Sequence, residues 1–131
     1  MPILALYSGI LGLLLVYLSL NVAMNRKKFK IGIGDGDNKD LARLIRVQAN
    51  FTEYVPTALI LLAVFESNHG HAIVAHIAGG VLVLGRLLHA YGLGKTVKVS
   101  FGRAVGMVLT WLSILGLAGM NIYYFVIAQV I

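Results

Sequence analysis

The chain has 131 residues, of which 59% are hydrophobic and only 12% are charged, and its formal net charge is +6. Soluble domains carry about 25% charged residues, so this composition excludes a soluble globular protein and indicates an integral membrane protein. The absence of cysteine excludes disulfides, thiolate metal ligands and a cysteine nucleophile from the chain itself.

Four long apolar segments predict four membrane-spanning helices, at about residues 3–25, 41–66, 72–93 and 103–131. Each reaches the ~20 residues that a helix needs to cross a hydrocarbon core. A helix is expected because lipid offers the backbone no other hydrogen-bond partner. We therefore predict an all-α fold, in which residues 1–131 form one transmembrane domain built as a four-helix bundle.

The connection after the first predicted helix is rich in Gly and Asp over residues 32–38, which predicts tight turns with positive φ. Its Asp-x-Asp spacing is a feature of calcium loops, but the Gly and Glu that an EF-hand needs are missing. A surface turn is therefore the better interpretation, and no metal is expected there. Asp40 is expected to cap the start of the second helix.

Three polar residues open the second helix: Arg46, Asn50 and Glu53. Their spacing of i, i+4 and i+7 predicts that a cation, an amide and an anion share one helix face. Ionisable groups in a membrane segment are costly unless partnered and are therefore candidate functional residues. The alternative is a polar stripe that holds helices together. Pro56 is expected to bend the helix farther along.

The second connection and the third helix supply further polar residues. His69 and His71 form only a weak metal pattern, and a solvated loop is the better interpretation. Arg86 and His89 are three residues apart, so they share a helix face, and Tyr91 follows near the helix end. Arg86 is a candidate for a structural ion pair with Glu53, and His89 is either a neutral core histidine or a site residue.

Arg103 stands at the entry to the fourth helix. It either anchors the helix to lipid headgroups or donates to an anion, since helix N-termini bind anions. Gly102 and Gly106 have the GxxxG spacing that allows close helix contact. The polar ends of the last three helices together suit a small ligand with carboxylates and an amine, such as glutathione. By charge alone, a phosphorylated or dicarboxylate ligand fits equally well.

The basic residues are distributed unevenly among the connections. None lies between residues 66 and 71, three lie in or at the end of the third connection (Lys95, Lys98 and Arg103), and seven lie in the first: Arg26, Lys27, Lys28, Lys30, Lys39, Arg43 and Arg46. By the positive-inside rule, the first and third connections are expected in the cytoplasm and both termini on the opposite side. This rule accounts for the positive charge without a nucleic-acid partner.

The run from Arg46 to Pro56, which contains Gln48, Asn50, Glu53 and Tyr54, resembles the R-x-Q-x-N-x-x-E-Y-x-P signature of the MAPEG family, membrane-associated proteins in eicosanoid and glutathione metabolism. The Arg86-Leu-Leu-His89 motif is similar to the third-helix motif of that family. The length, the four spans and the basic first connection also match. The resemblance covers nearly the whole chain and is nearest to short bacterial members, which implies the inner membrane of a bacterium.

The resemblance implies a homotrimer of four-helix subunits with a glutathione site between neighbours, open to the cytoplasm. It implies Arg103 as the catalytic residue, and it implies glutathione contacts from Arg26, Arg46, Asn50, Glu53, His89 and the nearby phenol of Tyr91. Glutathione would be the co-substrate and no metal is expected.

The function expected from the resemblance is a glutathione transferase for hydrophobic electrophiles that serves detoxification, with glutathione peroxidase activity as a further expectation. The alternative is a non-catalytic membrane protein that binds a lipid or an anionic metabolite through the same cations. A purely structural polar stripe remains open as well.

Overall fold

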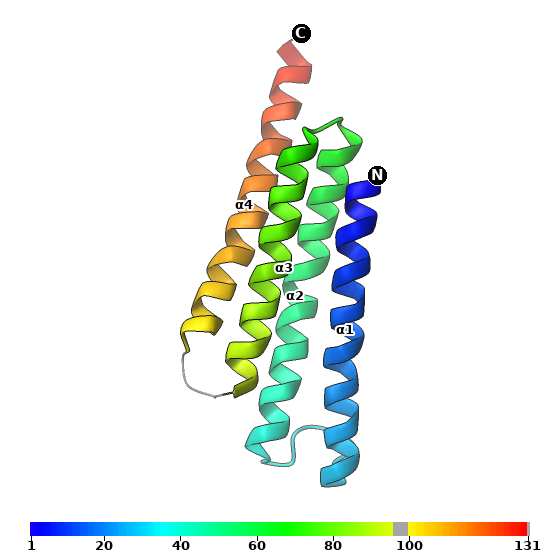
Figure 1. The fold of residues 1–131 in the computed structure, drawn as a ribbon, viewed down its shortest axis with the longest axis vertical. Helices are drawn as coiled ribbons and strands as arrows, with labels where there is room; N and C mark the ends of the chain where they lie inside the picture. The colour runs from blue at the N-terminus through cyan, green and yellow to red at the C-terminus, as the bar shows by residue number, and fades with distance from the viewer. Residues whose placement is uncertain (96–99, 131) are drawn as a thin grey trace.

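The computed structural model describes residues 1–95 and 100–130, with the backbone alone at 93–95 and 129–130. Its elements are four helices: α1 (Pro2–Phe29), α2 (Lys39–Ser67), α3 (Ala72–Lys95) and α4 (Phe101–Val130). All four are long and apolar enough to cross a membrane. The two termini lie at one end of the molecule, and α1 and α3 end at the other, where α2 and α4 begin (Figure 1). The all-α prediction of four membrane-length helices is confirmed.

Two boundaries at the first connection differ from the sequence prediction. Helix α1 continues to Phe29 and carries Arg26, Lys27 and Lys28 in its last turn, because cations are favourable beside the negative end of a helix dipole. The N-cap of α2 is Asn38, and the prediction that Asp40 caps this helix is wrong. The side chain of Asn38 accepts hydrogen bonds from the backbone N–H groups of Asp40 and Leu41, both at 3.0 Å.

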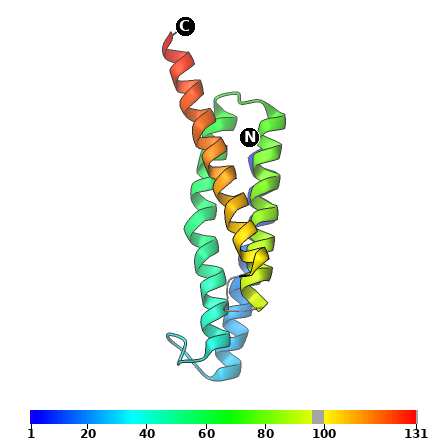
Figure 2. The same cartoon turned by 90° about the vertical axis from the view of Figure 1, so that its left-hand side faces the viewer.

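The helices are arranged around the α2–α3 pair. Helix α1 packs against α2 and α3, and α4 packs against α3 and α2, whereas α1 and α4 share no contact within the described part of the chain. Figure 2 shows α4 crossing obliquely over the bundle and extending beyond the turn that joins α2 to α3. The outward sides of the two flanking helices are apolar, as at Leu13 and Leu115, so they are suited to lipid or to another protein chain.

The core is divided into two clusters along the bundle axis. One cluster contains Phe51 and Val55 of α2 with Leu11, Leu18 and Leu82, and the other joins Phe65 to Leu62, Ala75 and Leu117. Beside these apolar clusters, polar hydrogen bonds link the helices to one another. Gln48 donates to Ser19 at 2.9 Å, Ser113 to the carbonyl of Ala78 at 2.9 Å, and Asn121 to the carbonyl of Leu61 at 2.9 Å. Such links replace the hydrophobic driving force that lipid removes.

Glycines allow α3 and α4 to approach closely near the end of the molecule that carries the polar residues. A Cβ added to Gly106 would lie 2.5 Å from the carbonyl oxygen of Gly85, and one added to Gly102 would lie 3.2 Å from the carbonyl oxygen of Leu88. A side chain at Gly106 would therefore push the two backbones apart, and one at Gly102 would be a tight contact. The close helix contact that the Gly102–Gly106 spacing predicts is therefore confirmed.

Candidate functional site

A buried arginine on α3 organises the polar centre of the bundle. Arg86 is only 1% exposed, and its Nη2 donates to Asn50 Oδ1 at 2.8 Å and lies 3.2 Å from His89 Nδ1. Its Nη1 reaches Thr110 Oγ1 at 3.5 Å and Met107 Sδ at 3.8 Å. The guanidinium carbon lies 5.7 Å from the centre of the Phe51 ring, and Nε has no hydrogen-bond partner. The cluster thus joins α2, α3 and α4 through one cation.

Glu53 does not pair with Arg86, so the predicted structural ion pair between them is wrong. The Glu53 carboxylate instead receives two hydrogen bonds from Arg46, at 2.9 and 3.1 Å, and both side chains are about half exposed. Residues 46 and 53 are seven apart and nearly coincide in angle around the helix, whereas Asn50 is rotated by about 60° from Glu53. That rotation is enough to turn Asn50 into the core and to leave Glu53 on the surface.

The predicted stripe on α2 therefore divides into two parts with different surroundings. Asn50 is buried beside Arg86, while Arg46 and Glu53 form an ion pair with two hydrogen bonds on the outside of the four-helix bundle. A charged pair at this position on a membrane helix is costly to leave against lipid. The pair is therefore suited to contact a polar ligand, headgroups or another subunit.

Arg26 lies close to Arg46 although it belongs to α1. Its Nη1 donates to the carbonyl of Gly34 at 2.8 Å and that of Gly32 at 3.3 Å, which holds the first connection against the end of α1. Arg26 and Arg46 both line a cavity of about 260 Å³, together with Gly34, Asp35 and Ala49 among others. The structure thus brings two of the predicted glutathione-binding cations to one hollow.

Arg103 lies in the first turn of α4, as the third residue of the helix that begins at Phe101. Its backbone N–H donates to Ser100 Oγ at 3.3 Å, and the chain there rests against Gly92 of α3. Arg86 Nη2 lies 3.2 Å from His89 Nδ1, and the contact between Gly92 and the backbone of Arg103 holds the start of α4 against the end of α3. Arg46 of α2, Arg86 of α3 and Arg103 of α4 therefore all lie toward the same end of the bundle. The N-terminus of α4 adds further positive charge there. Lys98, another cation of this connection, lies outside the described residues.

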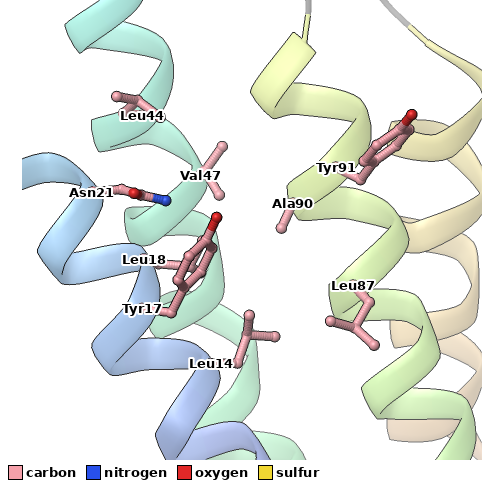
Figure 3. A pocket seen from close by; sticks show the side chains of 9 residues that line it. All are labelled: Leu14, Tyr17, Leu18, Asn21, Leu44, Val47, Leu87, Ala90 and Tyr91. Carbon is pink, nitrogen blue, oxygen red and sulfur yellow. The ribbon is translucent and has the colours of Figure 1, made fainter.

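Tyr91 is one of the residues that line a second cavity. This cavity of about 370 Å³ is open to the outside and is lined by residues of α1, α2 and α3, which are apolar except for Tyr17, Asn21 and Tyr91. Tyr17 and Asn21 point from α1 into the space, and Ala90 points into it from α3 (Figure 3). The cavity has the size and polarity of a small-molecule site. No group of three or more potential metal ligands occurs among the described residues.

Sequence reasoning missed Thr110 and Glu66. Thr110 is fully buried beside Arg86, and its position seven residues after Arg103, on the same face of α4, was the available signal. Glu66 accepts hydrogen bonds from the backbone N–H groups of Ile3 at 3.2 Å and Leu4 at 2.8 Å, so it caps α1. No local sequence pattern predicts that Glu66 caps α1, because Glu66 and its hydrogen-bond partners are more than 60 residues apart in sequence.

Comparisons with known proteins agree with this architecture. The model of the MAPEG family matches residues 4–123. The chain is 35% identical over 120 residues to the inner membrane protein YecN of Escherichia coli K12, and the aligned region covers 92% of this chain and 90% of YecN. The same figures hold for YecN of Escherichia coli O6:H1.

Proposed function

Because the chain belongs to the MAPEG family, we propose that it is a membrane-bound glutathione transferase for hydrophobic electrophiles. One observation carries the proposal: Arg86 of α3 contacts Asn50 and His89, the Arg46–Glu53 pair lies on α2 beside Asn50, and Arg103 begins α4 against Gly92. Glutathione carries two carboxylates, one amine and a thiol, so it matches a site with several cations and one carboxylate. Arginine is the residue that pairs best with a carboxylate.

The residues divide the work according to their charge. Arg46 and Arg26, which share a cavity, would hold carboxylates of the tripeptide, and Glu53 would receive its amine. Arg103, at the positive end of α4, would stabilise the thiolate, which is the reactive form of the thiol. The thiol proton leaves to solvent, the sulfur forms a bond to the electrophilic carbon, and the leaving group departs with its electron pair.

The same thiolate also suits a peroxidase reaction with a lipid hydroperoxide. Two glutathione molecules would then be oxidised to the disulfide, while the hydroperoxide is reduced to an alcohol and water. This reaction needs no group beyond those already described for the transferase.

An assembly of several copies is part of the proposal. The Arg46–Glu53 pair is about half exposed on a membrane-spanning helix, with side-chain exposures of 54% and 46%, and contact with lipid would be costly for it. A neighbouring copy of the chain would cover the pair and complete the ligand site, in the homotrimer that the family resemblance implies. The polar end of the bundle would face the cytoplasm, where glutathione is available.

The test combines ligand binding with turnover. Detergent-purified protein should be stabilised against heat by millimolar glutathione and should conjugate it to an apolar chloronitrobenzene. Arg103→Ala should lose turnover while keeping its oligomeric state, and Arg46→Ala should lose the glutathione-dependent shift. Arg43→Ala is the matched control, because Arg43 is a neighbouring cation on α2 that pairs with Asp40 at 3.0 Å. An Arg103→Ala protein with full turnover contradicts the assigned role.

A second candidate function is favoured by the cavity in Figure 3. Its apolar lining with a few polar groups also suits a lipid or another amphiphile, bound without chemistry. Ala90→Phe would fill this cavity from α3. If bound lipid decreases in that variant, and the wild-type protein neither binds glutathione nor conjugates it, the chain is a lipid-binding protein.

A further inference from the structure

Arg86 is surrounded by hydrogen-bond acceptors that carry no charge. Within the described part of the chain, its guanidinium has no carboxylate within ion-pair distance, and its partners are Asn50, His89, Thr110 and Met107. A buried cation without a counterion costs free energy. Charge neutralisation therefore does not explain why Arg86 is buried among these neutral partners.

The chemistry of arginine fixes the state of two of those partners. A guanidinium can only donate hydrogen bonds, and Nη2 carries two hydrogens, one for Asn50 at 2.8 Å and one for His89 at 3.2 Å. The Asn50 atom facing Arg86 must therefore be the carbonyl oxygen, and His89 Nδ1 must be unprotonated. His89 is then neutral with its single proton on Nε2.

The side-chain nitrogens of Asn50 and His89 that do not face Arg86 are consequently hydrogen-bond donors. Asn50 directs its NH₂ group, and His89 its Nε2–H, away from Arg86. Among the described residues neither group has a hydrogen-bond partner, and neither is one of the fully buried polar atoms that lack a partner. Both donors therefore keep some accessible surface, although the two residues are only 8% and 2% exposed.

We propose that Arg86 is a positioning residue that presents Asn50 and His89 as two preset donors to an acceptor group of the ligand. The acceptor is a carboxylate or thiolate, since Arg46 lies one turn before Asn50 on α2 and Arg103 lies in the first turn of α4, against Gly92 of α3, and both cations favour a negative charge. A protonated ligand amine can only donate hydrogen bonds, so it does not bind at the two donors of Asn50 and His89 and is expected at Glu53. The inference rests on the proposed function only for the identity of the ligand, because the donor pattern follows from the hydrogen bonds of the protein.

The first test needs no ligand. Nitrogen-15 NMR of the histidine rings reports which ring nitrogen carries the proton, and the chain has four histidines, of which the exposed His69 serves as an internal reference. In the wild-type protein, His89 should give one tautomer with the proton on Nε2, whereas His69 should populate both. A proton on Nδ1 of His89 overturns the proposal, and this result requires no variant that has to fold.

The second test removes the positioning group. Arg86→Met deletes the donors while keeping an unbranched side chain of similar length, and it should mix the His89 tautomers and weaken glutathione binding at least 10-fold. Arg86→Lys retains a donor and should restore part of both signals. An unchanged His89 spectrum in Arg86→Met overturns the proposal. A wild-type protein that shows the Nε2–H tautomer but binds no glutathione refutes the transferase function and leaves the positioning role intact.

Discussion

Gly92 of α3 lies directly against the backbone nitrogen of Arg103 at the start of α4. A Cβ added to Gly92 would overlap that nitrogen and would also lie 2.7 Å from Ser100 Oγ, the atom that caps Arg103. The position of the candidate catalytic arginine is therefore set by the absence of a side chain on the neighbouring helix. The contact between Gly92 and Arg103 therefore links the packing of α3 against α4 to the proposed chemistry.

Gly92→Ala should displace the first turn of α4 and reduce turnover, because the added methyl group meets backbone atoms that cannot rotate away. Overpacking of this kind costs about 1–3 kcal/mol. Gly116→Ala is the matched control, since a Cβ there meets no atom within 4 Å, and alanine favours the helix. Thermal unfolding and a conjugation assay should show losses for Gly92→Ala alone. Equal behaviour of the two variants would mean that the contact does not position Arg103.

Removing the Glu66 carboxylate should loosen the start of α1. Glu66 receives the backbone N–H groups of Ile3 and Leu4, and the loss of a helix cap costs about 0.5–2 kcal/mol. Glu66→Ala should lower the thermal midpoint and speed hydrogen exchange in the first turn of α1, and Glu66→Gln should lie between it and the wild type. Unchanged exchange in Glu66→Ala would contradict the capping role.

The Arg46–Glu53 pair should couple more strongly than an exposed ion pair if a second copy covers it. Exposed pairs contribute about 0–1 kcal/mol, whereas loss of one partner from a buried pair costs about 3–5 kcal/mol. A double-mutant cycle of Arg46→Gln and Glu53→Gln, read out by oligomer dissociation in detergent, should give a coupling above ~1 kcal/mol. A smaller value would indicate that the pair faces headgroups or water.

Sidedness can be measured directly because the chain has no cysteine. Gly32→Cys marks the first connection, where an added Cβ meets no atom within 4 Å, and Ser67→Cys marks the other end of α2. In cells with a permeabilised outer membrane, an impermeant maleimide should label the Ser67→Cys variant at once. It should label the Gly32→Cys variant only after the cells are lysed. The reverse order would place the basic connections outside, against the positive-inside rule.

The sequence determined the coarse architecture because lipid leaves few choices. Four apolar segments of sufficient length must become helices, since no other open structure satisfies the backbone in a membrane. The close α3–α4 contact was also readable, because Gly102 and Gly106 are spaced for one helix face. The predicted helix ends were less accurate. Asn38 and Asp40 are both plausible N-caps of α2, and the local sequence does not choose between them.

Only the tertiary structure decided how the polar residues are partnered. The spacing of Arg46, Asn50 and Glu53 gave their angles relative to one another, but it did not give the rotation of α2 against its neighbours. That rotation turns Asn50 toward Arg86 and leaves Glu53 outside with Arg46. Helical periodicity fixes which residues lie near one another on a helix, whereas packing against other helices fixes which of them face the core. The ion pair expected from charge alone was wrong for this reason, and the donor pattern around Arg86 became visible only once the helices were packed.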